Sequence, residues 1–182
     1  MLVVVDMQLV FASGAPWATP GFEQLERPVA RLVEAFGDRV AFTRFVLPSE
    51  PQGSWATYYQ TWAEVRRPGA ARLFELAHPW ATLARSTIDM PTFSKWGPEL
   101  KAGVGRGGEL VLCGVATDCC LLATALAASD DGVHVRVVSD AAAGATAEAH
   151  RSALVVLQGF SPQILVTTVA EELERLAGPS WP

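Results

Sequence analysis

The sequence alternates short apolar runs rich in β-branched residues with stretches of helical periodicity, and this alternation limits the fold more than any other feature. Leu2–Val5 is an unbroken apolar run, which is typical of a central strand buried on both faces. Residues 22–36 carry apolar side chains at helical spacing, and Gly37 and Asp38 end that pattern. Repeated units of this kind with right-handed crossovers predict a three-layer α/β/α fold with a parallel sheet.

The rest of the chain continues the same alternation. Further strands are expected at residues 39–46, 86–90, 109–113, 133–138 and 163–166, and helices at 68–77, 98–104, 120–129, 146–159 and 169–176. Residues 47–67 combine prolines with four aromatic residues, so we expect a long loop there that acts as a lid or an oligomer contact. A length of 182 residues suits a single domain spanning residues 1–182.

Composition and charge exclude several classes of partner. The net charge of -5 argues against non-specific nucleic-acid binding and against binding to an anionic membrane surface. The apolar run at the N-terminus meets Asp6 with no basic segment before it, so no signal peptide is expected. Three cysteines, two of them adjacent, do not suggest a disulfide framework, and a reducing cytoplasm is the expected location.

Polar residues follow three of the expected strands directly. Asp6 follows the first strand, residues 114–120 follow the fourth, and Asp140 follows the fifth. In parallel α/β sheets the functional groups collect at the carboxyl ends of the strands. These positions are therefore the first candidates for a site.

Cys120 is the candidate nucleophile. It lies in the first turn of an expected helix, for which Thr117 or Asp118 is the expected N-cap. The helix dipole and unpaired N–H groups at such a position stabilise a thiolate, which predicts a thiol pKa well below 8.5 and fast alkylation. The alternative is that Cys119 and Cys120 are small buried apolar residues, as free cysteines commonly are.

Asp6 and Lys95 are candidates for the acid–base chemistry. A carboxylate at the end of four apolar strand residues is costly to bury unpaired, so Asp6 fits a general base, or alternatively caps a turn through its own backbone. The chain has only two lysines, Lys95 and Lys101. Lys95 lies between aromatic residues and could pair with Asp6, or stay solvated with its stem over Trp96.

Other motifs are set aside on their context. Residues 103–108 match the spacing G-x-G-x-x-G but precede a strand, whereas a dinucleotide-binding loop follows one. The histidines and cysteines lack the spacing of metal ligands, so no metal and no cofactor is expected. A redox pair of Cys119 and Cys120 would need a strained eight-membered ring.

Two segments together resemble the isochorismatase-like, or cysteine hydrolase, superfamily. The stretch Val3-Val-Val-Asp-Met-Gln8 followed by Phe11 is similar to its opening strand, and Gly114-Val-Ala-Thr-Asp-Cys-Cys-Leu-Leu-Ala-Thr-Ala125 is similar to its nucleophile segment. Residues 135–143 resemble the strand that follows. The resemblance implies a Rossmann-like sheet of six parallel strands, a triad of Asp6, Lys95 and Cys120, an oxyanion hole from the N–H groups of Ala116 and Cys120, and a cis peptide bond between Val115 and Ala116.

The sequence departs from this family at two places. The family lysine usually precedes a serine by four residues, and because Ser94 matches that serine, the expected lysine position is Met90. Lys95 is assigned the role instead, the alternative being a site without lysine. Nicotinamidases of the superfamily bind a metal with residues after the second strand, and here residues 43–48 offer no such ligands. Isochorismatases proper lack the nucleophilic cysteine, so the presence of Cys120 argues against that assignment.

The resemblance implies a cysteine-dependent hydrolase that cleaves an amide-type C–N bond of a small molecule through a thioester. The alternatives are a non-catalytic binding or scaffold protein on the same fold, and an isochorismatase-type hydrolase of another small substrate. Aromatic residues suit the pocket of a small, partly apolar substrate, and the candidates are Phe11, Trp17, Phe45, Trp55 and Trp96, each of which could equally be core or interface. A homo-oligomer, dimer or tetramer, is expected.

Overall fold

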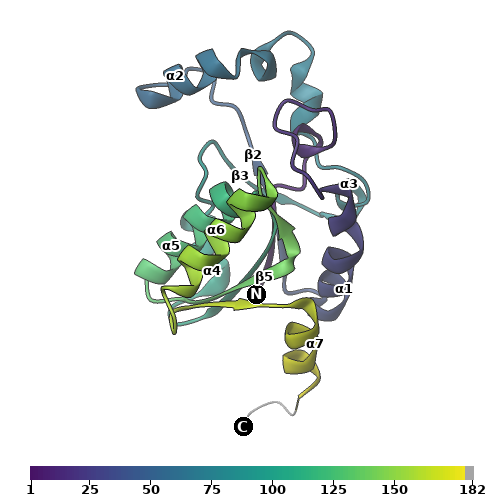
Figure 1. Cartoon of the computed structure of the whole chain (residues 1–182), viewed down its shortest axis with the longest axis vertical. Helices are drawn as coiled ribbons and strands as arrows, with labels where there is room; N and C mark the ends of the chain where they lie inside the picture. The colour runs from purple at the N-terminus through teal and green to yellow at the C-terminus, as the bar shows by residue number, and fades with distance from the viewer. Residues whose placement is uncertain (179–182) are drawn as a thin grey trace.

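Six parallel strands form one sheet with the order β3-β2-β1-β4-β5-β6 (Figure 1). The computed structural model describes residues 1–178, so the last four residues of the expected domain, 179–182, lie outside the described residues. The strands are β1 (Leu2–Val5), β2 (Val40–Phe45), β3 (Thr87–Met90), β4 (Glu109–Val115), β5 (His134–Ala143) and β6 (Ile164–Thr167). This sheet confirms the predicted architecture.

Helices cover both faces of the sheet because alternate strand residues point to opposite sides. On β1, Leu2 and Val4 join the apolar core beneath α1 (Glu26–Phe36) and α7 (Val169–Ala177). Val3 and Val5 join the core beneath α4 (Pro98–Val104), α5 (Leu122–Asp130) and α6 (Ala147–Gln158). Figure 1 shows these two groups of helices on opposite sides of the sheet. The central strands are apolar throughout because both of their faces are buried.

The junction of β1 and β4 is the point where the strand order reverses. Val5 pairs with Gly114, whose φ of +105° favours glycine. A Cβ at this position would lie 2.2 Å from the carbonyl oxygen of Val5, so a side chain there would push the two strands apart. This close approach brings the residues that follow β1 beside those that follow β4.

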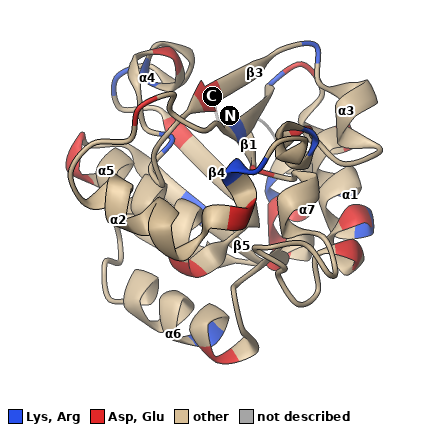
Figure 2. Cartoon of the chain, turned by 90° about the horizontal axis from the view of Figure 1, so that it is seen from above, with Lys and Arg blue, Asp and Glu red and all other residues tan. Residues whose placement is uncertain are grey.

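The segment of residues 47–67 differs from the expected loop. It contains α2 (Ser54–Thr61) and a 3-10 turn at Ala63–Arg66, and it lies beyond the end of the sheet (Figure 1). Helix α2 carries no charged residue, whereas α1 and α6 carry both acidic and basic residues (Figure 2). The prolines and Gly53 flank α2 rather than interrupt it, which is why they suggested an irregular segment.

Other boundaries moved by a few residues. The expected helix at 68–77 is a 3-10 turn at Ala70–Phe74 with α3 (Trp80–Leu83) after it, and the helix at 22–36 begins as a 3-10 turn. Strand β5 continues to Ala143 because Ala142 and Ala143 still pair with β4, so Asp140 lies within the strand. Asp140 accepts a hydrogen bond from the N–H of Val169 and so belongs to the start of α7. Within residues 1–178 no helix has the length and apolarity needed to span a bilayer.

Candidate active site

Asp6 is held directly after β1 in a buried and unusual conformation. Its side chain is fully buried, and its φ of +49° makes it the only non-glycine residue with positive φ among the described residues. Thr43 on β2 donates to Asp6 Oδ1 at 2.6 Å and accepts from the Asp6 N–H at 3.2 Å. Such sparsely populated backbone conformations cluster at functional sites because the surrounding structure must enforce them. The carboxylate does not cap its own turn, which was the alternative interpretation.

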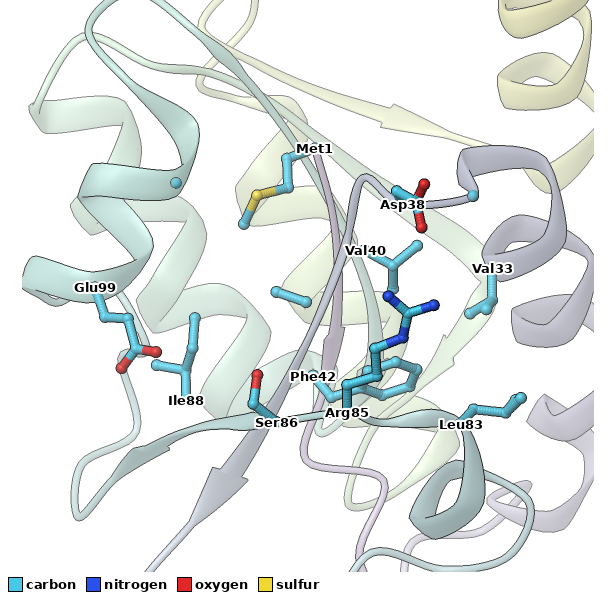
Figure 3. A pocket seen from close by; sticks show the side chains of 13 residues that line it. Met1, Val33, Asp38, Val40, Phe42, Leu83, Arg85, Ser86, Ile88 and Glu99 are labelled. Carbon is cyan, nitrogen blue, oxygen red and sulfur yellow. The ribbon is translucent and has the colours of Figure 1, made fainter.

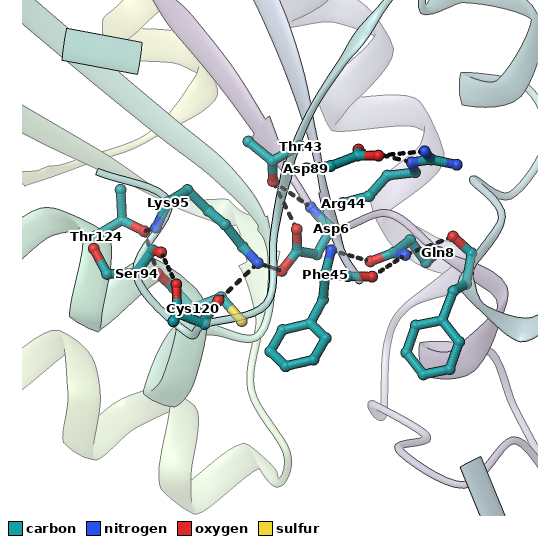
Figure 4. A network of polar contacts seen from close by, with 12 residues as sticks. Asp6, Gln8, Thr43, Arg44, Phe45, Asp89, Ser94, Lys95, Cys120 and Thr124 are labelled. Carbon is teal, nitrogen blue, oxygen red and sulfur yellow. Dashed lines mark hydrogen bonds and ion pairs between the residues drawn. The ribbon is translucent and has the colours of Figure 1, made fainter. Parts of the chain in front are cut away.

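Lys95 forms a buried ion pair with Asp6 (Figure 4). Its Nζ lies 3.0 Å from Asp6 Oδ2, 3.0 Å from the carbonyl oxygen of Thr92 and 4.7 Å from the centre of the Phe45 ring. Both side chains of the pair are fully buried, so each charge offsets the cost of burying the other. The exposed-lysine alternative therefore does not apply to Lys95.

Cys120 lies in a π-helical turn, Thr117–Leu121, between β4 and α5. The N-cap of this turn is Ala116 and no side chain caps it, so neither Thr117 nor Asp118 has the expected role. Thr117 instead contacts His150 Nδ1 at 2.9 Å, and Asp118 accepts from the N–H of Ala145 at 2.9 Å. The peptide bond between Val115 and Ala116 is cis, as the resemblance implied.

The pKa of the Cys120 thiol differs from the low value expected for a cysteine in the first turn of a helix. Burial raises the pKa of this thiol well above its usual range, and the nearby Asp6 carboxylate raises it further, while Lys95 lowers it. The prediction of a depressed pKa was wrong because removal from water disfavours the thiolate more than the start of the helix favours it. The thiol is therefore protonated at neutral pH and faces a carboxylate that can accept its proton.

Buried polar residues that sequence analysis did not single out hold this group in place. The N–H of Lys95 donates to Thr124 Oγ1 at 2.9 Å, and Thr124 donates to the carbonyl oxygen of Cys120 at 2.6 Å. Gln8 exchanges hydrogen bonds with the backbone of Phe45, at 2.8 and 3.0 Å, and donates to the carbonyl oxygen of Phe74 at 2.6 Å. The first two bonds tie the segment that carries Lys95 to the one that carries Cys120, and those of Gln8 anchor the segment after Asp6 to β2 and to Phe74.

A cavity of about 240 Å³ opens onto Cys120. Its walls are mostly apolar and consist of Phe11, Pro16, Trp17, Ala18, Thr19, Phe45, Tyr58, Trp62, Phe93, Ala116, Cys119, Cys120 and Ala145. Both residues expected to supply an oxyanion hole, Ala116 and Cys120, are therefore at the cavity. Its aromatic walls surround the nucleophile candidate, which gives the cavity the character of a small-molecule site.

The expected pocket aromatics divide into two groups. Phe11, Trp17 and Phe45 line the cavity, but Trp55 and Trp96 do not. Trp55 packs behind the wall, with its ring 4.9 Å from that of Phe93 and 5.9 Å from that of Phe45. Trp96 faces away, because its indole N–H donates to Asp131 at 2.6 Å and the Lys101 ammonium lies 5.7 Å from its ring.

Three lining aromatics were missed as site residues: Tyr58, Trp62 and Phe93. Tyr58 and Trp62 come from the aromatic-rich segment 47–67, whose composition was the signal available in the sequence. Phe93 precedes Lys95 by two residues. It lies far from Cys120 in the sequence, so nothing in the sequence indicated that Phe93 and Cys120 would line the same cavity.

A second hollow, of about 380 Å³, lies elsewhere and contains none of the candidate site residues. Met1, Asp38, Val40 and Arg85 face it from around the amino ends of β1 and β2 (Figure 3). In sheets of this type ligands bind at the carboxyl ends of the strands, and this hollow lies at the opposite edge of the sheet. The functional candidate is therefore the smaller cavity beside Cys120.

The residues present do not fit the metal centre known in nicotinamidases. The segment after β2 begins Val46-Leu47-Pro48, which offers no metal-binding side chain. Within residues 1–178 no group of three or more histidine, cysteine, aspartate or glutamate side chains is arranged to hold a metal ion.

Both the sequence and the fold have counterparts among known proteins. The sequence matches the isochorismatase domain family over residues 1–171. No curated protein gives a significant sequence match. A cysteine hydrolase from Pseudomonas syringae pv. phaseolicola 1448A has a similar structure, with TM-score 0.79, 20% identity and coverage of 97% of this chain and 91% of that chain.

Two further solved structures share the fold. An isochorismatase family protein from Desulfovibrio vulgaris subsp. vulgaris str. Hildenborough has TM-score 0.78, 20% identity and coverage of 97% of both chains. A nicotinamidase from Bacillus subtilis has TM-score 0.71, 22% identity and coverage of 91% of this chain and 97% of that chain. With the family match extending over residues 1–171, this chain belongs to the isochorismatase family.

Proposed function

We propose that this protein is a cysteine hydrolase that cleaves an amide-type C–N bond of a small molecule through a thioester. The observation that carries the proposal is the meeting of a protonated thiol, a buried carboxylate and a buried ammonium beside one cavity. A nucleophile within reach of a base that is itself oriented by a third group is the usual arrangement for covalent catalysis.

In the first half of the reaction Asp6 takes the thiol proton, and the Cys120 sulfur attacks the substrate carbonyl carbon. The N–H groups of Ala116 and Cys120 are assigned to the oxyanion that forms. Collapse of this intermediate breaks the C–N bond, and Asp6 returns the proton to the departing amine. The products of this half are a free amine and an acyl group bound to sulfur as a thioester.

In the second half water enters and Asp6 takes one of its protons, so that hydroxide adds to the thioester carbonyl. Breaking the C–S bond releases a carboxylic acid, and the proton on Asp6 returns to the thiolate. Lys95, paired with Asp6 at 3.0 Å, stabilises the anionic form of that carboxylate in both halves. The complete reaction consumes one water molecule for each C–N bond that is cleaved, and no atom is oxidised or reduced.

The non-catalytic alternative loses its main support in the structure. That support was the absence of a lysine at Met90, yet Lys95 places its ammonium 3.0 Å from Asp6. Slow alkylation of the free thiol would by itself favour a binding protein, but Asp6, which with burial raises the pKa of the thiol, is also the group placed to take its proton. An isochorismatase-type reaction on another small substrate does not use the thiol, which makes it the weaker of the two hydrolase readings.

The test is turnover by Cys120→Ala on an amide identified by screening for ammonia or amine release. We expect a loss of about 10⁴-fold or more, as for removal of other covalent nucleophiles. Cys113→Ala is the matched control, since Cys113 is buried in the core beneath α1 and does not line the cavity. Wild-type turnover by Cys120→Ala would overturn the mechanism, and an acyl adduct mapped to Cys120 by mass spectrometry would support it.

A further inference from the structure

We infer that the cavity selects uncharged, largely apolar amides and rejects substrates that carry a carboxylate. This inference rests on the proposed function and names the substrate class of the same site. It follows from the character of the walls, from the charges just behind them and from the helix that completes them.

The walls offer no charged partner to a substrate. Six aromatic residues dominate them, Phe11, Trp17, Phe45, Tyr58, Trp62 and Phe93, and no acidic or basic side chain is among the lining residues. Their rings pack tightly on one another, with Trp17 at 5.4 Å from Phe45 and at 6.1 Å from Tyr58. A carboxylate placed against such walls would lose its hydration without gaining an ion pair.

The charges closest to the cavity do not attract an anion. The Lys95 ammonium is already neutralised by Asp6 at 3.0 Å and bound by the Thr92 carbonyl at 3.0 Å. Asp118 lies beside the cavity, where its Oδ2 accepts from the Cys119 thiol at 3.7 Å. After burial, Asp118 is the next cause of the rise in the pKa of Cys119 to about 11. The same negative charge repels a carboxylate brought into the cavity.

Tyr58 supplies a polar contact within these apolar walls. It belongs to the uncharged helix α2 and lines the cavity together with Cys119 and Cys120, and burial raises the pKa of its hydroxyl. A neutral phenol at the cavity can donate to an uncharged acceptor or accept from a donor. Helix α2 therefore gives the site both its apolar outer wall and a hydrogen bond suited to a neutral ligand.

The experiment measures the hydrolysis of three related amides by the full-length protein. Benzamide is neutral, 4-carbamoylbenzoate adds one carboxylate to the same ring, and acetamide removes the ring. We expect kcat/KM for ammonia release to be at least about 100-fold higher with benzamide than with 4-carbamoylbenzoate, because burying an unpaired carboxylate is costly. Acetamide should be poorer than benzamide because it leaves the aromatic walls unfilled.

Two variants of Trp62 test whether a positive charge in the wall weakens the preference for the neutral amide. Trp62→Arg adds a guanidinium to the wall, and Trp62→Phe is its neutral control; Trp62 is only half-buried, so an arginine there can keep its charge near water. We expect Trp62→Arg to raise the relative rate with 4-carbamoylbenzoate by at least about tenfold over Trp62→Phe. Equal relative rates in the two variants would contradict the inference.

Binding to Cys120→Ala, measured by calorimetry, separates this inference from the proposed function. Tighter binding of benzamide than of 4-carbamoylbenzoate, with no ammonia released by the wild type, would retain the substrate class and overturn the hydrolase. Hydrolysis of both amides at similar rates, or faster hydrolysis of the carboxylate, would retain the hydrolase and overturn the substrate class. Failure of benzamide both to bind to Cys120→Ala and to react with the wild type would also overturn the substrate class.

Discussion

At the scale of single residues, the fully buried pair of Asp6 and Lys95 is the most costly feature of the protein. Two charges removed from water are tolerated only if each finds a close partner and further hydrogen bonds. Thr43 and the Thr92 carbonyl supply those bonds. The arrangement places a carboxylate inside an apolar site beside Cys120, from which it takes a proton in the proposed mechanism.

Lys95→Met tests this pairing. It leaves Asp6 buried without a cation, and we expect a loss of about 3–5 kcal/mol in the free energy of unfolding, measured by urea denaturation at pH 8. Activity should also fall, because the ammonium that stabilises the Asp6 carboxylate in the proposed mechanism is gone.

The double variant Asp6→Asn with Lys95→Met is the control for that experiment. It removes both charges, so it should regain part of the stability lost in Lys95→Met while staying inactive. If the double variant is no more stable than Lys95→Met, the two charges are not coupled in the folded protein.

At the scale of elements, the site depends on how closely β1 and β4 approach. Both strands end at the point where the strand order reverses, and they deliver Asp6 and the 116–120 turn to the same place. Gly114 permits this approach, because its missing Cβ leaves room for the Val5 carbonyl. A side chain there would separate the base from the nucleophile even if the sheet stayed intact.

Gly114→Ala measures the importance of that approach, and Gly132→Ala is its control. Both glycines have positive φ, +105° and +81°, but only Gly114 would place a Cβ against another strand. We expect Gly132→Ala to cost about 1–2 kcal/mol from backbone conformation. Gly114→Ala should cost about 1–3 kcal/mol more from the clash, and should lose activity. Equal effects in thermal denaturation would show that the close approach does not matter.

At the scale of the whole molecule, three thiols make stability depend on alkaline pH. Burial raises the pKa of Cys113 and of Cys120, and raises that of Cys119 to about 11. An unfolded thiol ionises near pH 8.5, so the unfolded state loses protons before the folded state does. Stability from this source is complete below about pH 8.5 and declines as the pH rises above it.

We therefore expect the free energy of unfolding to fall by about 1 kcal/mol per fully buried thiol between pH 8.5 and pH 9.5. Denaturation curves in a reducing buffer at several pH values measure the slope. The variant Cys113→Ala should show a shallower decline than the wild type, because it has one fewer buried thiol. If the free energy of unfolding of Cys113→Ala declines with pH as steeply as that of the wild type, ionisable groups other than this buried thiol cause the decline. Assembly into a dimer or tetramer and a cytoplasmic location stay predictions.

The sequence was sufficient to predict the strands and to single out Asp6 and Cys120 as candidates, because these depend on local patterns. A buried strand is recognisable from its unbroken apolar residues, and a polar residue at its carboxyl end follows from the same pattern. Lys95 was harder, because it lies in the irregular segment between β3 and α4, where no periodicity fixes the direction of a side chain. Its position is set by Thr124, which is 29 residues away in sequence.

By itself, then, the sequence determined the succession of strands and helices along the chain, the carboxyl ends of β1 and β4 as places where chemistry is possible, and the family. Tertiary structure alone decided that Tyr58, Trp62 and Phe93 form the walls while Trp96 turns away, and that the Cys120 thiol is protonated. The physical reason is that strand and helix patterns are properties of neighbouring residues. Burial, and with it the pKa of a thiol and the lining of a cavity, depends on which distant segments pack together.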